Sequence, residues 1–276
     1  MNKMTCSKLL RQILTLLILF SVSGCATVPL TGRHQLSLVP ESDVISLSLT
    51  EYDKFIKSNK LSTDKNKIAM VKRVGERISK AVETYMATAG LSQNLNGYKW
   101  EFNLIEDQTI NAWCMSGGKV VVYTGLMPVA LDENGLATVL GHEISHAVAR
   151  HGSERMSNQM LLQMGSTALS TAMASKPAET RNIVMTAFGI GSQVGVVLPF
   201  SRDNEYEADY MGLIFMAMAG YDPNLSVPFW ERMAKQGGQK PPEFLSTHPV
   251  DANRIARLKE KMPDAMAYYN KSKTTK

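Results

Sequence analysis

Cysteine is scarce in this sequence, with three residues among 276. Cys6 lies in an N-terminal leader, and Cys25 follows that leader directly. Only Cys114 remains in the body of the chain, so a framework of intramolecular disulfides is excluded. We expect Cys114 to be packed as a small apolar side chain.

The sequence also lacks a strong excess of either charge. It holds 30 Lys and Arg residues against 25 Asp and Glu residues, for a formal net charge of +5. Three of the basic residues, Lys3, Lys8 and Arg11, lie in the leader, and without them the net charge is +2. Nucleic-acid-binding proteins typically concentrate basic residues on one face, so we expect no nucleic-acid partner.

No apolar run in the leader is long enough to cross a bilayer. A spanning helix needs about 20 apolar residues, and the run at residues 13–22 is shorter. Basic residues before it and small residues leading into Cys25 are typical of a cleaved signal peptide over residues 1–24. The motif that ends in Cys25 resembles a bacterial lipobox. That resemblance implies cleavage before Cys25, lipidation of Cys25 and, because Ala26 follows, attachment to the outer membrane facing the periplasm.

The remaining sequence has the composition of a globular domain, 44% hydrophobic and 20% charged. Residues 25–50 contain Ser, Thr and Pro with few charges, and we expect them to form a lipid-anchored tether. We place the folded domain at residues 51–265 and a flexible tail at residues 266–276.

Hydrophobic periodicity predicts an α+β fold that is predominantly helical. Spacings of three and four residues indicate helices, which we place at about residues 41–56, 64–90, 132–150, 205–220, 227–235 and 250–261. Alternating or β-branched runs at residues 98–105 and 119–124 indicate a small mixed sheet beside the helix over 132–150. Residues 156–199 predict two more helices that pack on the domain, and their contact with a membrane surface is left open.

The clearest local motif is His142-Glu143-Ile144-Ser145-His146, which has the form H-E-x-x-H. Two histidines four residues apart lie on one face of a helix, so both imidazoles can reach one Zn²⁺ at about 2.0–2.1 Å. Glu143 is then placed beside the metal, where a general base for the attacking water belongs. The motif predicts one zinc ion per chain.

A catalytic zinc site usually has three protein ligands, and here the third must come from elsewhere in the sequence. Glu205 is the strongest candidate, at the expected start of a helix, and Asp209 lies four residues later on nearly the same face. Asp209 can accept a hydrogen bond from the far nitrogen of a ligand histidine and fix its orientation. Glu207 points away from Glu205 and is a poorer candidate. We expect a structural role for His151.

Three interpretations are open for His248. It stabilises the oxyanion of a tetrahedral intermediate, it occupies the open zinc position and holds the site inactive, or it caps the helix that follows Pro249. Arg254, on that helix, is a candidate to support the same wall of the site.

The segment Lys119–Tyr123 has two interpretations. It is either part of the core or an exposed edge strand that pairs with an extended peptide substrate. On the second interpretation, the predicted substrate-binding residues are Asn111, Ala112, Lys119, Val120 and Val121.

Four segments in order resemble the HtpX/BepA/LoiP/Oma group of gluzincin zinc metallopeptidases: residues 111–126, 142–146, 201–209 and 247–255. Residues 31–43 also resemble the N-termini of its lipoprotein members. The resemblance covers about residues 28–260 and implies a gluzincin domain. In that domain the zinc ligands are His142, His146 and Glu205, the base is Glu143, and His248 is a catalytic or regulatory histidine.

The same resemblance implies a zinc metalloendopeptidase of the bacterial cell envelope. Its implied partners are unfolded or misassembled envelope polypeptides, the outer membrane through the lipid anchor, and the envelope assembly machinery. The alternative is a zinc-containing periplasmic chaperone or assembly factor for outer-membrane proteins, in which proteolysis is latent or regulated.

Overall fold

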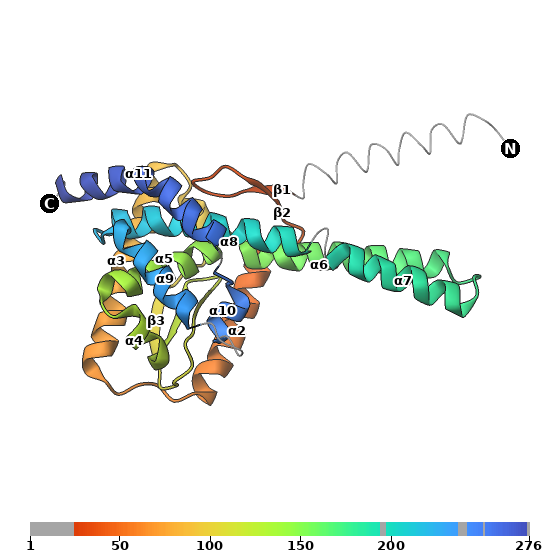
Figure 1. Ribbon diagram of the computed structural model, residues 1–276, viewed down its shortest axis with the longest axis horizontal. Helices are drawn as coiled ribbons and strands as arrows, with labels where there is room; N and C mark the ends of the chain where they lie inside the picture. Colours follow the sequence, from red (N-terminus) through yellow and green to blue (C-terminus); the bar gives the residue numbers. More distant parts are fainter. Residues whose placement is uncertain (1–24, 194–196, 237–241, 251, 275–276) are drawn as a thin grey trace.

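The structure is a computed structural model that describes residues 25–193, 197–236, 242–250 and 252–274, with backbone only at 198–200. The predicted signal peptide therefore lies outside the described residues. The fold is mostly helical with a small mixed sheet, as the hydrophobic periodicity predicted (Figure 1).

The strands are β1 (Cys25–Thr27), β2 (His34–Leu36), β3 (Glu101–Ile105), β4 (Ala112–Met115) and β5 (Lys119–Tyr123). The helices are α2 (Glu41–Ser58), α3 (Lys65–Thr88), α4 (Met127–Ala130), α5 (Glu133–Val148), α6 (His151–Ala172), α7 (Ala178–Ser192), α8 (Leu198–Met218), α9 (Ser226–Lys235), α10 (Glu243–Thr247) and α11 (Ala252–Thr274). Short 3-10 helices are η1 (Ser92–Leu95), η2 (Thr124–Leu126) and η4 (Pro223–Leu225).

Strand β5 lies at the centre of the three-stranded sheet. It pairs in parallel with β3 and antiparallel with β4, and all of its residues are buried. The prediction that Lys119–Tyr123 is an exposed edge strand is therefore wrong, because both of its edges are already hydrogen-bonded. Its unbroken apolar run over residues 120–122 is the pattern of a strand that is covered on both faces.

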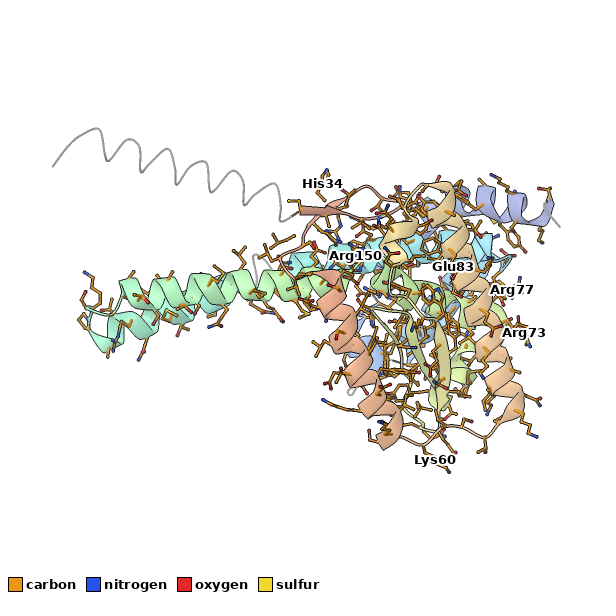
Figure 2. All side chains as sticks on the ribbon, turned by 180° about the vertical axis from the view of Figure 1, so that it is seen from behind. His34, Lys60, Arg73, Arg77, Glu83 and Arg150 are labelled. Atoms are coloured by element: carbon orange, nitrogen blue, oxygen red, sulfur yellow. The ribbon has the colours of Figure 1, made fainter. Side chains whose placement is uncertain are left out.

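The segment expected to be a tether is structured. Strands β1 and β2 form an antiparallel hairpin in which Cys25 lies opposite Leu36, and helix α2 follows at residue 41. Positive φ angles of 71° at Leu30 and Gly32 let the chain reverse, and Val28 packs into the main core. Figure 2 shows this hairpin, marked by His34, lying on the body of the domain. The expected flexible tail differs too, since α11 continues to residue 274.

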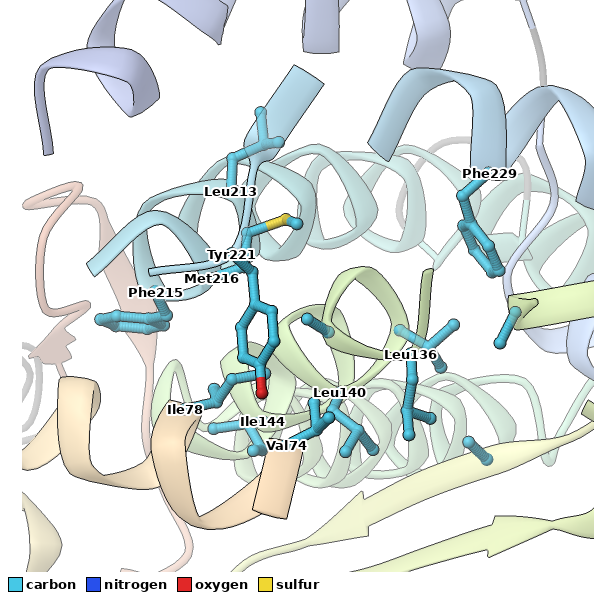
Figure 3. Close-up of a cluster of buried hydrophobic side chains, with 14 of the residues drawn as sticks. Val74, Ile78, Leu136, Leu140, Ile144, Leu213, Phe215, Met216, Tyr221 and Phe229 are labelled. Carbon is cyan, nitrogen blue, oxygen red and sulfur yellow. The ribbon is translucent and has the colours of Figure 1, made fainter. Parts of the chain in front are cut away.

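Helices α5 and α8 pack against each other in the middle of the core. Apolar side chains from both helices and from α3 meet there (Figure 3), and those of Leu140, Ile144 and Phe215 are fully buried. The two backbones are close at Gly141 and Gly212: a Cβ added to Gly212 would lie 2.9 Å from the backbone nitrogen of residue 142. This close packing brings the H-E-x-x-H helix against the helix that carries Glu205.

Helices α6 and α7 form a two-helix arm that extends from the body of the domain (Figure 1). The two helices were predicted, but their packing along the domain was not borne out, since α7 has no fully buried residue. Met164, Ile183 and Ile190 are between 61% and 64% exposed. Among the described residues, no helix combines the length and the apolar character needed to cross a bilayer.

Candidate metal centre

The side chains of His142, His146 and Glu205 converge between α5 and α8. The Nε2 atoms of His142 and His146 are 3.1 Å apart. The Glu205 carboxylate lies 3.4 Å from each of them. We expected Glu205 at the start of its helix. In the structure α8 already begins at residue 198, so Glu205 lies within the helix.

This arrangement fits a zinc ion. Four ligand atoms at about 2.0–2.1 Å from a tetrahedral zinc lie about 3.3 Å from one another, and the observed separations are 3.1 and 3.4 Å. Two imidazole nitrogens this close repel each other unless a proton or a metal cation lies between them. Burial also holds the pKa of His146 well below its usual range, so its imidazole is neutral, as a metal ligand must be.

His248 completes a set of four potential metal ligands. Its Nδ1 atom lies 3.2 Å from Nε2 of His142 and 3.0 Å from Oε1 of Glu205. Its other ring nitrogen, Nε2, lies 3.5 Å from Oε1 of Glu143. The imidazole therefore occupies the side of the site where an open fourth position is expected, which favours the interpretation of His248 as a group that blocks it.

Glu143 is buried beside the ligands. Its Oε1 atom has no hydrogen-bond partner among the described residues. Burial raises the pKa of Glu143, and the nearby His248 and His142 act in the opposite direction. A carboxylate with an open acceptor and a raised pKa is suited to take a proton from water near neutral pH.

Asp209 supports His142 on the side of the ring away from the other ligands, and Arg254 in turn holds Asp209. Nδ1 of His142 lies 2.9 Å from Oδ1 of Asp209. The Arg254 guanidinium donates to both oxygens of the same carboxylate, at 2.8 and 2.7 Å. Burial opposes a charged imidazole, but the carboxylates of Asp209 and Glu205 outweigh it and raise the pKa of His142 to about 9 in the metal-free site, so a metal that binds this ring displaces a proton.

The pattern that defines peptidase family M48 matches residues 72–262 of this chain, which include every residue of the site described above. The chain belongs to peptidase family M48. Among M48 relatives, it is 37% identical over 190 residues to the mitochondrial metalloendopeptidase OMA1 of Schizosaccharomyces pombe, covering 68% of this chain and 53% of that protein.

Two further relatives extend the comparison. The chain is 30% identical over 259 residues to the mitochondrial metalloendopeptidase OMA1 of Homo sapiens, covering 91% of this chain and 48% of that protein. It is 34% identical over 164 residues to the beta-barrel assembly-enhancing protease of Escherichia coli K12, covering 57% and 33%. The chain thus spans about half of these M48 proteins or less.

One contact of the M48 site was missed at the level of sequence. Nδ1 of His151 lies 2.8 Å from Nδ1 of His146, and its Nε2 lies 3.0 Å from Oε2 of Glu207. In a straight helix, a residue five positions on points about 140° away. Here Arg150, with a left-handed φ of 58°, separates α5 from α6 and turns His151 back. Glu207 could have indicated this contact, because it was an acidic residue near the predicted ligand Glu205 to which the sequence assigned no role.

The predicted substrate-binding residues of this M48 chain separate into two groups. Ala112 begins β4, an edge strand of the sheet, and Asn111 directly precedes it. Lys119, Val120 and Val121 lie on the central strand β5, where the sheet itself occupies both edges. The structure contradicts their predicted role, and Lys119 instead pairs with Glu101 at 2.9 Å.

Proposed function

We propose that this chain is a zinc-dependent endopeptidase that holds one zinc ion through His142, His146 and Glu205. The observation that carries the proposal is three ligand groups, two imidazoles and one carboxylate, at tetrahedral spacing beside the buried Oε1 of Glu143, which has no hydrogen-bond partner among the described residues. A bound zinc ion supplies a Lewis acid that polarises a carbonyl and lowers the pKa of water. The named activity of the relatives, metalloendopeptidase, is consistent with this chemistry.

Glu143 is the proton carrier in this mechanism. Its open oxygen accepts a proton from the attacking water and later donates it to the leaving amine. Asp209 keeps the Nδ1 proton of His142 in place, so that the opposite nitrogen of the ring faces the metal site.

We propose that the substrate pairs with the edge of β4. The backbone nitrogen of Tyr123 donates to the backbone oxygen of Asn111 at 3.1 Å. This bond shows which residues of β4 direct their backbone groups toward β5. Backbone groups on such a strand point inward and outward in turn. Those of Ala112 and Cys114 therefore face the outer edge, where an extended polypeptide can add as another strand once the Ala112 N–H leaves its hydrogen bond to Asn111 Oδ1 at 2.9 Å.

We propose that His248 controls access to the site. With its Nδ1 atom 3.0 Å from Glu205 and 3.2 Å from His142, the side chain must move before water can enter the fourth position. The same contact favours the second candidate function, an assembly factor with latent proteolysis, because zinc sites closed by four protein ligands are structural.

We further propose that the protein acts on misfolded or misassembled envelope polypeptides from the periplasmic face of the outer membrane. Support comes from the lipobox-like sequence before Cys25, from the exposure of Cys25, and from the name of one relative, a beta-barrel assembly-enhancing protease. Cys25→Ser is expected to move the protein from the membrane fraction to the soluble fraction and to abolish incorporation of labelled fatty acid. Unchanged fractionation would contradict the anchor.

The peptidase mechanism is tested on the full-length chain purified in detergent. Zinc content and cleavage of unfolded casein are measured for the wild type, Glu143→Gln, His248→Ala and the surface control Glu83→Gln. We expect one zinc per chain throughout, and a loss of cleavage in Glu143→Gln of about 10²–10⁴-fold. Equal cleavage by the wild type and Glu143→Gln would overturn the mechanism.

The His248→Ala variant separates the interpretations of that residue. Faster cleavage than the wild type supports a blocking role, whereas loss of cleavage with zinc retained supports a role at the oxyanion. If the wild type holds zinc and neither it nor His248→Ala cleaves casein, the assembly-factor function is favoured.

A further inference from the structure

We propose that the N-terminal hairpin is part of the metal centre, because Arg33, Glu207 and His151 form a chain of contacts that positions His146. This inference rests on the proposed zinc site. It assigns positioning roles to Arg33, Glu207 and His151, and it includes a segment of the chain that lies outside the M48 match at residues 72–262.

The outer end of the chain of contacts is an ion-pair cluster. Nε of Arg33 donates to Oε2 of Glu207 at 2.8 Å, and its Nη1 and Nη2 donate to the two oxygens of Glu154 at 2.7 and 2.9 Å. Thr31 Oγ1 also donates to Oε1 of Glu207. Glu154 and Glu207 are buried, at 1% and 7% exposure. One guanidinium from the hairpin thus forms ion pairs with two buried carboxylates, which would be costly to leave unpaired.

The inner end fixes the ligand ring. Because Nε2 of His146 faces the other ligands, its Nδ1 carries the proton and donates to Nδ1 of His151 at 2.8 Å. Nε2 of His151 then carries a proton and donates to Glu207 at 3.0 Å. A carboxylate can only accept, so Glu207 requires the proton of His151 to be on Nε2 and leaves Nδ1 of His151 as an acceptor. Glu207 thus selects the tautomer of His151 and, through it, the orientation of His146.

The two ligand histidines therefore have equivalent supports. Behind His142, the chain of contacts runs through Asp209 to Arg254. Behind His146, it runs through His151 and Glu207 to Arg33. The first chain joins α5, α8 and α11, whereas the second reaches the β1–β2 hairpin.

Two further hydrogen bonds fix the N-terminal segment against α5 and α6, next to His151. Gln35 Nε2 donates to the carbonyl oxygen of Ala149 at 2.8 Å, and the backbone nitrogen of Leu38 donates to Ser157 Oγ at 2.9 Å. Ala149 directly precedes the left-handed residue Arg150 at the junction of α5 and α6, and Ser157 lies within α6. Arg150 is labelled close to the hairpin in Figure 2. The hairpin thus covers the junction that turns His151 toward His146.

The test compares zinc affinities in the full-length protein. Competition with a chelator gives the zinc Kd of the wild type, Arg33→Ala, Arg33→Lys, His151→Leu and His151→Asn. The matched control is Arg73→Ala, since Arg73 also binds a carboxylate through its guanidinium, that of Glu133, on a distant exposed face (Figure 2). Thermal unfolding of each zinc-free variant separates a loss of metal affinity from a loss of fold.

We expect zinc binding to weaken about 10–100-fold in His151→Leu and about tenfold in Arg33→Ala. His151→Asn keeps an acceptor for the His146 proton and is expected to recover most of that loss. Arg33→Lys keeps the charge but loses the planar guanidinium that reaches both carboxylates, so its zinc Kd is expected to lie between those of the wild type and Arg33→Ala. Arg73→Ala is expected to have the wild-type zinc Kd. The absorption spectrum of the cobalt-substituted protein should shift in His151→Leu and stay unchanged in Arg73→Ala.

Two results would overturn the inference. One is wild-type zinc affinity in both Arg33→Ala and His151→Leu. The other is a loss of thermal stability in zinc-free Arg33→Ala with no change in Kd, which would make the hairpin contact merely structural. A wild type that binds no zinc would instead overturn the proposed function, so the two failures are distinguishable.

Discussion

Asp209 accepts hydrogen bonds from two residues that serve different purposes, His142 and Arg254. The first contact orients a ligand, and the second places a buried positive charge against the helix that carries Glu205. Removing the carboxylate therefore affects metal binding and folding together.

Asp209→Ala is expected to weaken zinc binding about 10–100-fold and to destabilise the zinc-free protein by about 3–5 kcal/mol, because Arg254 stays buried with less of its charge paired. Chelator competition and denaturant unfolding measure the two effects. Asp264→Ala, an exposed change on α11, is the control and should alter neither. A wild-type Kd for Asp209→Ala would contradict the support of His142.

Residue spacing made some of these roles predictable and hid others. Glu205 and Asp209 could be paired because positions four apart share a helix face. Arg33 gave no such signal, since its partners Glu154 and Glu207 are 121 and 174 positions away. The contact of His151 with His146 was not predicted, because the left-handed φ of Arg150 that turns His151 back leaves no mark in the residue spacing.

At the scale of elements, the packing of α5 on α8 decides where the ligands meet. The closest approach is at Gly141 and Gly212, where a Cβ on Gly212 would lie 2.9 Å from the nitrogen of residue 142 and 3.0 Å from the carbonyl carbon of Gly141. Both neighbours are backbone, so neither can move aside alone.

Gly212→Ala is expected to destabilise the protein by about 1–3 kcal/mol through overpacking and to weaken zinc binding, because separating the helices moves Glu205 away from both histidines. Thermal unfolding and chelator competition report the two changes. The matched control is Gly189→Ala in α7, where an added Cβ meets nothing within 4 Å. It should stabilise by about 0.5–1 kcal/mol, and equal effects at the two sites would refute this account of the helix contact.

The arm formed by α6 and α7 contrasts with this core. Ile183 and Ile190 are 64% and 61% exposed, whereas Leu140 is fully buried. We expect Ile183→Ser and Ile190→Ser to change the free energy of unfolding by less than about 0.5 kcal/mol and Leu140→Ala to cost about 2–5 kcal/mol. Denaturant titration of the three variants checks this, and large losses from the arm variants would show that the arm is covered in solution.

The positions of the helices and strands in the sequence were easier to predict than their arrangement in space. Periodicity located α3 and α5, the composition of residues 156–199 indicated the two helices of the arm, and the fold class followed from them. Strand order did not follow, because the run over residues 120–122 supports a strand without saying which strands flank it. The hairpin was missed because β1 and β2 have three residues each, too few for an alternating pattern to stand out.

At the scale of the whole molecule, the candidate ligands come from α5, α8 and the segment after α10, so a bound ion ties three parts of the chain together. A ligand that binds only the folded state stabilises it by about 4.1 kcal/mol at a free concentration 1,000 times its Kd. Chelation is therefore expected to lower Tm, and added zinc to restore it.

Calorimetry with and without chelator measures that shift. Glu143→Gln should keep it, since Glu143 is not a ligand, whereas His146→Ala should lose most of it. A Tm that does not respond to chelator in the wild type would mean that zinc does not hold these segments together.

The arm leaves the metal site after His146 and returns to it before Glu205, and its turn around residues 173–176 is held by local backbone hydrogen bonds. Extra polypeptide inserted at that turn would lengthen a loop whose closing points are fixed, and each doubling of loop length costs only about 0.6 kcal/mol. A reporter domain can therefore be inserted at this turn. It would report the location of the protein without changing the positions of the metal ligands.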